Sequence, residues 1–212
     1  MDYKEIINHY KKCFKKFGDT ARGVDWTKED QVNIRYQVML EITNFYKKSY
    51  DNKKKISILD FGCGLSHFYE YLNKNDLNHI DYTGLEISKI FFEESKKKYP
   101  KNMYIYGDIL KDDNLLNKTY DYVISNGVFT EKNNLTYDYM FDYLEKMIVL
   151  IFKSCTKGMA FNLMSKQVDW EVETLFHVPI DDIANLLTKK ITRNFIVRND
   201  YGLYEYTVYV YK

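Results

Sequence analysis

Apolar and polar positions alternate along the chain with two periods, one typical of buried strands and one typical of amphipathic helices. Short apolar runs predict strands at 56–61, 80–86, 103–107, 121–126 and 158–164. Apolar positions three or four residues apart predict helices between them, at 66–76, 88–99, 137–154 and 180–189. Strands at 191–198 and 203–211 follow, joined by the turn Asn199-Asp200-Tyr201-Gly202. Repeated strand–helix units predict an α/β fold, a doubly wound and mostly parallel sheet closed by one antiparallel strand.

The first quarter of the chain has the helical period only. Residues 2–17 and 27 to about 49 predict two helices, separated by the break Gly18-Asp19-Thr20-Ala21-Arg22-Gly23. Thr27-Lys28-Glu29-Asp30 has the spacing of a capping box, and the lysines at 53–55 read as a solvated linker. We therefore predict an N-terminal helical cap or lid over residues 1–55 and one compact unit over residues 56–212.

Composition narrows the class of protein. The chain has 212 residues, a net charge of +1 and 45% hydrophobic residues, which suits a globular domain without a field that recruits nucleic acid. The lysine runs read as solvated helix faces. Cys13, Cys63 and Cys155 are widely spaced and match no metal-binding pattern, so we expect reduced thiols, no metal and a cytoplasmic protein. The charged N-terminus and the lack of an apolar run of about eighteen residues predict no signal peptide and no membrane span.

The segment Ile58-Leu59-Asp60-Phe61-Gly62-Cys63-Gly64 reads as a buried strand that ends in a glycine turn. Glycine permits positive φ angles and close approach of the backbone to a ligand, and Ser66 has the position of a helix N-cap. Such a turn directs N–H groups and a helix N-terminus toward one point. A dinucleotide fingerprint would need a third glycine at His67, and no P-loop pattern is present.

With the acidic residue Glu86 at the end of the next strand, this segment resembles motif I of the class I S-adenosylmethionine (SAM)-dependent methyltransferases. Gly107-Asp108-Ile109 resembles the segment with the family's adenine-binding acid, and Asp121-Tyr122-Val123-Ile124-Ser125-Asn126-Gly127 resembles its motif IV. The resemblance covers residues 56–164. It implies a seven-stranded sheet with the order 3-2-1-4-5-7-6, SAM as cofactor and S-adenosylhomocysteine (SAH) as product.

The resemblance also implies roles for individual residues. The expected cofactor-binding residues are Asp60, Gly62, Cys63 and Gly64 for the methionine end, Glu86 and Ile87 for the ribose, Asp108 and Ile109 for the adenine, and Asn126 and Gly127 beneath the sulfonium. From the N-terminal helices we expect Trp26, Arg35 and Tyr36 to form a lid, with Arg35 pairing the cofactor carboxylate. Ser66 departs from the family pattern, because it replaces the third glycine of motif I.

The acceptor side is less defined. His177, in the loop after the fifth strand, is the candidate general base, and Asp200 and Tyr201 in the last turn are candidates for gripping a polar acceptor. Each also has a purely structural interpretation, as a capping residue or a charged hairpin tip. The slot Ser125-Asn126-Gly127-Val128 lacks the Asn-Pro-Pro-Tyr signature of DNA amino-methyltransferases.

We therefore predict a methyltransferase that acts on a small-molecule acceptor, a polar one such as a sugar or small acid. The sequence leaves other functions open: an RNA or protein methyltransferase, a catalytically inactive SAM-binding protein, and a dinucleotide oxidoreductase, which His67 disfavours.

Overall fold

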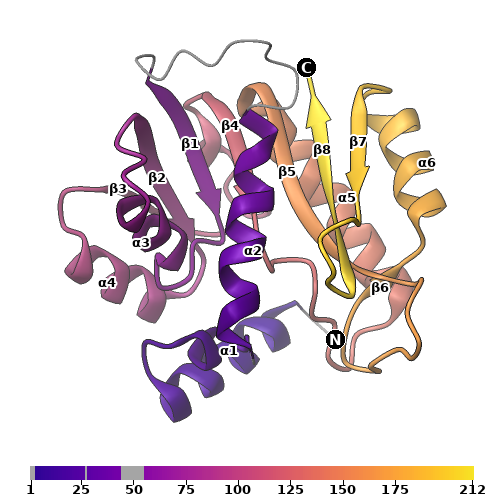
Figure 1. Ribbon diagram of the computed structural model, residues 1–212, viewed down its shortest axis with the longest axis horizontal. Coiled ribbons are helices and arrows are strands. Elements are labelled where there is room, and N and C mark those ends of the chain that lie inside the picture. The colour runs from indigo at the N-terminus through magenta and orange to yellow at the C-terminus, as the bar shows by residue number, and fades with distance from the viewer. Residues whose placement is uncertain (1–2, 27, 44–54) are drawn as a thin grey trace.

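The computed structural model describes residues 3–26, 28–43 and 55–212, and in these ranges eight strands form one sheet (Figure 1). The strands are β1 (Ile56–Phe61), β2 (Ile80–Glu86), β3 (Met103–Tyr106), β4 (Tyr120–Ser125), β5 (Cys155–Ser165), β6 (His177–Val178), β7 (Phe195–Arg198) and β8 (Glu205–Tyr211). Their order is β3-β2-β1-β4-β5-β8-β7, and β6 pairs with β5 beside this path. The predicted order 3-2-1-4-5-7-6 is confirmed, because β7 and β8 are the sixth and seventh predicted strands.

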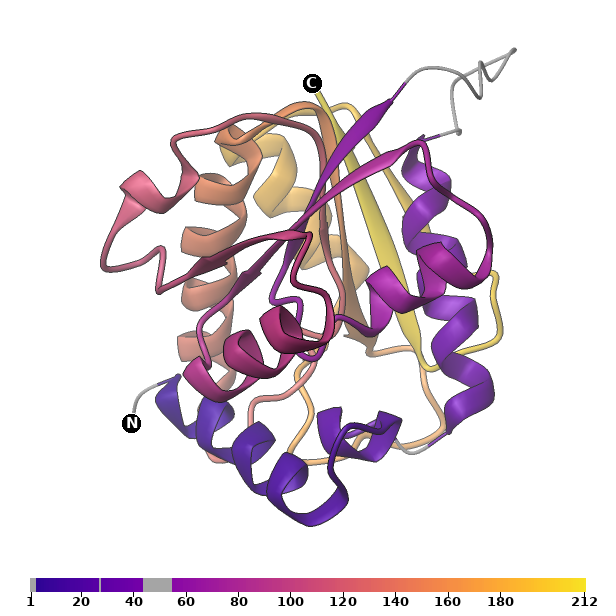
Figure 2. The same cartoon turned by 90° about the vertical axis from the view of Figure 1, so that its left-hand side faces the viewer.

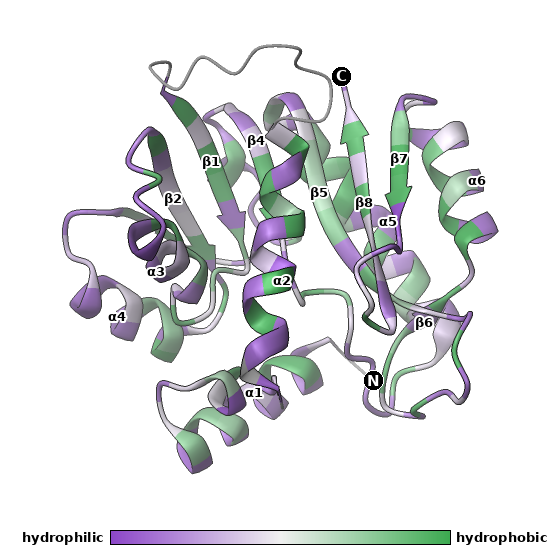
Figure 3. Cartoon of the chain, in the orientation of Figure 1, coloured by the Kyte–Doolittle hydropathy of each residue, from purple (hydrophilic) through white to green (hydrophobic). Residues whose placement is uncertain are grey.

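Strand directions place the carboxyl ends of the main strands at one edge of the sheet. Strands β1 to β5 run parallel, β8 is antiparallel to β5, and β7 is antiparallel to β8, so β7 points the same way as β1. The strands are coloured hydrophobic along much of their length in Figure 3, as expected for a sheet covered on both faces. The turn between β7 and β8 therefore lies at the edge where the glycine turn lies.

Helices cover both faces of the sheet. They are α3 (His67–Lys74), α4 (Lys89–Lys98), α5 (Tyr137–Lys153) and α6 (Ile180–Lys190). Successive side chains of a strand point to opposite faces, so Leu59 packs in a cluster with residues of α5 and α6, whereas Ile58 packs with residues of α3. These two apolar layers confirm the predicted doubly wound α/β class.

The N-terminal segment divides between two places. Helix α1 (Lys4–Phe17) and the 3-10 turn η1 (Ala21–Val24) lie across the carboxyl ends of the strands (Figure 2), and α1 ends at Gly18, which adopts a φ of 64°. Helix α2 (Glu29–Leu40) and the turn η2 (Glu41–Thr43) pack instead in the apolar layer that contains Ile58. Part of the predicted 1–55 cap is thus a wall of the sheet layer rather than a lid.

Most element boundaries lie within a few residues of the predicted ones, and β1 and β2 coincide with the predicted ranges. The strand predicted over 191–198 begins only at Phe195, because Ile191 still bonds to α6 through its N–H to the Leu187 oxygen. The helix predicted from 27 to about 49 is described only as α2 and η2, and Thr27, residues 44–49 and Lys53–Lys54 lie outside the described residues. Among the described helices, none has the length and apolar character needed to cross a membrane.

Candidate functional site

A cavity of about 150 Å³ lies at the carboxyl edge of the sheet, beneath α1 and η1. Its floor comes from the ends of four strands, namely Asp60–Leu65, Leu85–Ser88, Gly107–Ile109 and Asn126–Val128. Its roof comes from Tyr3, Ile6, Ile7, Tyr10, Val24 and Trp26, and Tyr36 closes one side. The four segments that the sequence analysis singled out therefore meet around one space.

The glycine turn after β1 has the backbone that its residues predict. Gly62 and Gly64 adopt φ angles of 74° and 53°, and the N–H groups of Gly62 and Cys63 both bond to the Leu85 oxygen, at 2.9 and 3.0 Å. A Cβ on Gly62 would lie 2.4 Å from a methyl carbon of Val128, so a larger residue cannot occupy this position without a shift of its neighbours.

Ser66 differs from its predicted role. It precedes α3 but makes no side-chain cap, and its hydroxyl lies 2.9 Å from that of Tyr104. Ser66 holds the predicted N-cap position, but its φ of 59° is the left-handed conformation that glycine favours, and the expected side-chain capping bond is not made. The backbone keeps a glycine-like shape although the third glycine of the motif is absent.

Glu86, the last residue of β2, bonds to the backbone of the glycine turn. Its two carboxylate oxygens accept the N–H of Gly64 at 2.8 Å and the N–H of Ser88 at 2.6 Å. Burial raises the pKa of Glu86 to about 7, and these backbone hydrogen bonds lower it in part. The carboxylate is thus fixed in position at the cavity wall.

Two further acids line the same cavity. Asp60 is buried at the end of β1 and accepts a hydrogen bond from the Tyr82 hydroxyl at 2.8 Å. Burial raises the pKa of Asp60 to about 7, against the Tyr82 hydrogen bond, and the Glu86 charge raises it further. Asp108 accepts hydrogen bonds from the Tyr3 hydroxyl and, at 3.1 Å, from the Leu110 N–H. The roof therefore touches the floor directly at Asp108.

The loop after β4 forms the opposite end of the cavity. The Gly127 N–H donates to the Asn162 side-chain oxygen at 2.7 Å, and the Gly127 oxygen accepts the Tyr10 hydroxyl at 3.2 Å. A Cβ on Gly127 would lie 3.4 Å from the Trp26 ring. Among the described residues, the buried amide N and O of Asn126 have no hydrogen-bond partner, and the same holds for the Ser88 hydroxyl. Both residues line the cavity, so it offers polar atoms that a ligand would satisfy.

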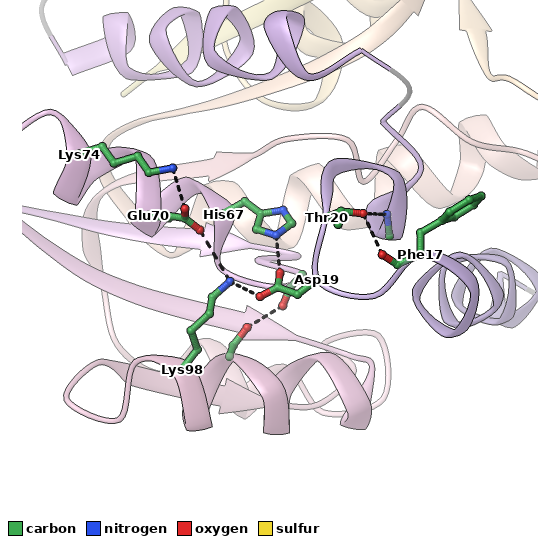
Figure 4. Close-up of polar contacts among 10 residues, drawn as sticks. Phe17, Asp19, Thr20, His67, Glu70, Lys74 and Lys98 are labelled. Atoms are coloured by element: carbon green, nitrogen blue, oxygen red, sulfur yellow. Dashed lines mark hydrogen bonds and ion pairs between the residues drawn. The ribbon is translucent and has the colours of Figure 1, made fainter.

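Charged groups at the margin of the cavity attach the roof to the floor, and one of them, His67, also lines the cavity (Figure 4). Asp19, in the turn after α1, contacts His67 Nε2 at 2.7 Å and Lys98 Nζ at 2.6 Å. Lys98 also lies 3.8 Å from Glu70, which pairs with Lys74 at 2.7 Å. Burial raises the pKa of Asp19, but the hydrogen bonds from Lys98 and His67 outweigh it and leave the pKa below its usual value.

Arg35 does not line the cavity. Its Nε donates to Glu205 Oε2 at 2.9 Å, and its guanidinium carbon lies 5.4 Å from the centre of the Trp26 ring. The other Glu205 oxygen accepts the Asn162 amide at 3.2 Å, which continues to the Gly127 N–H. The structure thus pairs Arg35 with a carboxylate of the protein, whereas we expected a contact with the cofactor.

The three candidate catalytic residues also lie outside the cavity lining. His177 is buried, with Nδ1 2.6 Å from the Ser165 oxygen and Nε2 accepting the Val172 N–H at 3.1 Å. With both ring nitrogens engaged, His177 has no nitrogen available to take a proton from an acceptor. Asp200 is exposed and pairs with Arg198 at 2.6 Å, and the Tyr201 hydroxyl lies 3.0 Å from that of Thr207. All three side chains therefore bond to other parts of the protein, away from the cavity in which they were expected to act.

The other predicted cofactor-binding residues line the cavity. They are Trp26, Tyr36, Asp60, Gly62, Cys63, Gly64, Glu86, Ile87, Asp108, Ile109, Asn126 and Gly127. Roles for Tyr3, Tyr10 and Asn162 at this site were not predicted. The spacing of Tyr10 in α1 indicated only a packed helix face, and Asn162 lies inside a strand with no motif around it. Their contacts with Asp108 and Gly127 depend on tertiary structure alone.

Comparison with known proteins identifies the family of the chain. The family model described as "Methyltransferase domain" matches residues 52–196. The Mycobacterium tuberculosis protein Rv1506c, which is named as a methyltransferase, is 22% identical over 158 residues, covering 74% of this chain and 93% of its own.

Solved structures share the fold. The magnesium protoporphyrin IX methyltransferase of Synechocystis, crystallised with SAH, superposes with a TM-score of 0.64 at 16% identity, covering 100% of both chains. The plantazolicin methyltransferase BpumL, also in complex with SAH, gives 0.63 at 15% identity, covering 99% of this chain and 97% of its own.

Proposed function

The chain belongs to the methyltransferase-domain family, as predicted, and on that premise we propose that its cavity binds SAM and that the protein methylates a small polar acceptor. The observation that carries this proposal is the convergence of four strand ends on one roofed cavity. SAM and SAH are also the ligands named for the solved neighbours.

The residues of the cavity fit such a ligand. The unpaired Asn126 amide and Ser88 hydroxyl need hydrogen-bond partners that the described part of the chain does not supply. A side chain on Gly62 would meet Val128, and one on Gly127 would meet the Trp26 ring of the roof, so glycine at both positions keeps this part of the cavity open. Polar groups at two ends and apolar walls between them suit a molecule with an amino acid, a ribose and an adenine.

Each acid would hold one part of the ligand. A carboxylate offers about four lone-pair directions, so Glu86, which uses two for backbone N–H groups, retains acceptors for two hydroxyls. Asp108 would accept from an exocyclic amine, in exchange for the Tyr3 hydroxyl or beside it. Asp60, at the end that Tyr36 closes, would face a cationic amino group.

When bound, SAM supplies a methyl group on a positively charged sulfur, which is already a reactive electrophile. The contribution of this chain is therefore mainly positioning. Asn162 holds the backbone N–H of Gly127 and Tyr10 holds its backbone oxygen. Trp26 packs over the same residue. The geometry supports transfer to an acceptor oriented beside this loop, and it assigns no described side chain as a general base.

The proposed acceptor side lies toward the β7–β8 turn. The Arg35 guanidinium lies there, with its Nε held by the buried Glu205, which in turn accepts the Asn162 amide. Trp170 and Tyr204 are exposed, at 66% and 56%, and their ring centres lie 5.9 Å apart. These groups support a small acceptor with hydroxyl or carboxyl groups, and the exposed ring pair suits an acceptor that also carries a ring.

The test begins with calorimetric titration of the full chain with SAM and SAH. We expect binding in the micromolar range, weakened at least about tenfold in Glu86→Ala and Asp108→Ala because each removes a carboxylate that lines the cavity. Glu93→Ala, an exposed carboxylate on α4, is the matched control. Unchanged affinity in both cavity variants, or no binding by the wild type, would contradict the proposal. Methyl transfer to sugars, small acids and ring-bearing acceptors is then measured with labelled SAM.

A further inference from the structure

Three side chains of different chemistry meet behind the roof of the cavity. His9 and Cys13 are four residues apart on α1, so they project from one helix face, and Asp25 follows η1. His9 Nε2 lies 2.6 Å from Asp25 Oδ2 and 3.7 Å from Cys13 Sγ. One ligand-type atom from each residue lies within 4.8 Å of the other two.

This combination of an imidazole nitrogen, a thiol sulfur and a carboxylate oxygen is one that Zn²⁺ prefers. Around a tetrahedral zinc ion, sulfur and nitrogen ligands lie about 3.5 Å apart, given bond lengths of about 2.3 and 2.0 Å. The 3.7 Å between Cys13 Sγ and His9 Nε2 is close to that separation. The His9–Asp25 pair is closer than two zinc ligands, so an ion would replace this hydrogen bond and move the two atoms slightly apart.

A further carboxylate, that of Glu131, lies near these residues but outside the group whose ligand atoms are all within 4.8 Å of one another. Glu131 is buried, with 8% of its surface exposed, and lies near enough to Asp25 and His9 for both charges to act on its carboxyl group. Two carboxylates in a partly buried cluster repel each other unless a cation neutralises them. Glu131 stands four residues after Gly127, in a segment separate from α1, so its presence is independent of the helical His9–Cys13 spacing.

We propose that His9, Cys13 and Asp25 form a binding site for a Zn²⁺ ion, with a water molecule as the fourth ligand and the Glu131 carboxylate as a nearby negative charge. The sequence analysis expected no metal, because it compared only the spacing of the cysteines. The proposal goes beyond methyl transfer and does not depend on it.

The position of the site suggests what the ion would do. Tyr10, next to His9, bonds to the Gly127 oxygen, and Trp26, next to Asp25, packs over Gly127. An ion that joins His9 to Asp25 would therefore fasten two separate parts of the roof over the same loop. Its expected effect is structural, on the stability of the roof.

The test uses untagged full-length protein, freed of metal with a chelator and titrated with Zn²⁺. We expect one equivalent to bind, and the Co²⁺-loaded protein to show the near-ultraviolet absorption of a thiolate–cobalt bond. Cys13→Ser and His9→Gln are each expected to weaken Zn²⁺ binding at least about tenfold, because each removes one ligand. Cys155→Ser changes a buried thiol elsewhere and should bind Zn²⁺ like the wild type.

Thermal unfolding monitored by circular dichroism separates metal binding from simple misfolding. Zn²⁺ should raise the melting temperature of the wild type and of Cys155→Ser, and leave that of folded Cys13→Ser unchanged. If the folded wild type binds no stoichiometric Zn²⁺, or if folded Cys13→Ser binds it as tightly as the wild type, the proposal is wrong.

Discussion

At the scale of single residues, burial of carboxyl groups at the cavity wall makes the stability of the protein depend on pH. The pKa of Glu86 and of Asp60 is raised to about 7, mainly by burial. Each folded-state pKa lies above the unfolded value, so the folded protein retains protons that the unfolded chain releases. The protonated Glu86 and Asp60 therefore contribute a stability that is fully present below about pH 4 and is lost as the pH rises through about 7.

We therefore predict that the ligand-free protein is less stable at pH 8 than at pH 5. The effect is on the order of 3 kcal/mol for Glu86 alone. Urea denaturation at a series of pH values measures it, and Asp60→Asn should reduce the pH dependence because it removes one titrating group while keeping an acceptor for Tyr82. The exposed control Glu93→Gln should leave the slope as in the wild type; an equal reduction there would contradict the assignment.

The left-handed backbone at Ser66 yields a second prediction at this scale. Ser66→Gly and Ser66→Ala both lose the hydroxyl contact with Tyr104, but only alanine keeps a side chain at a φ of 59°. We expect Ser66→Ala to be less stable than Ser66→Gly by about 1 kcal/mol. Chemical denaturation of the two variants provides the comparison, and equal stabilities would show that the position carries no backbone strain.

At the scale of elements, ion pairs join the turn after α1 to α3 and α4. We predict that Asp19→Asn loosens α1 and η1, because it weakens the contacts with His67 and Lys98. The loss of global stability should be below about 1 kcal/mol, as for other exposed pairs. Hydrogen exchange over residues 4–26 should become faster, and high salt should reproduce the effect in the wild type.

The matched control for this prediction is Asp142→Asn. It breaks an exposed pair with Lys146 on α5, at 2.6 Å, far from the roof in the sequence. Exchange over residues 4–26 should not change in this variant. Accelerated exchange in both variants would show that the roof responds to general destabilisation and not to the contacts of Asp19.

The elements also show which features a single sequence can predict. The run that became β1 is mostly apolar and ends at the motif glycines, and the run that became β2 ends at the motif acid Glu86, so patterning and motif together located both strands. The two-residue strand β6 has no such pattern, because it is defined by its pairing with Met164 and Ser165 of β5. Likewise, the motif glycines and Glu86 could be recognised from spacing, whereas the partners of Arg35 and His177 required the folded chain.

At the scale of the whole molecule, the two N-terminal helices have different roles. Helix α1 lies over the cavity, whereas Val38, Met39 and Ile42 pack in the same apolar cluster as Ile58 and other strand residues. The chain before β1 is therefore partly a cover and partly core. This distinction was not predicted, because both helices were assigned to one cap over residues 1–55.

Two truncations test the distinction. Removal of residues 1–25 should leave a cooperatively folding protein whose SAM affinity is at least about tenfold weaker, because the roof is lost. Removal of residues 1–43 should abolish cooperative folding, since it uncovers the apolar layer on one face of the sheet. Circular dichroism and calorimetry provide the measurements. If the shorter and the longer truncation unfolded at the same temperature, α2 would not be part of the core.

The roof contacts the floor at both ends of the cavity, through Tyr3 at Asp108 and through Trp26 at Gly127. A molecule the length of the cavity cannot enter or leave past either end while both contacts are in place. A catalytic cycle in which the donor and the product pass beneath α1 and η1 needs two openings of this segment, one for the donor to enter and one for the product to leave. Methyl transfer and ligand exchange are then separate steps. When opening of α1 and η1 is the slower step, the first turnover after mixing is faster than those that follow, and the steady-state rate is set by this movement rather than by methyl transfer.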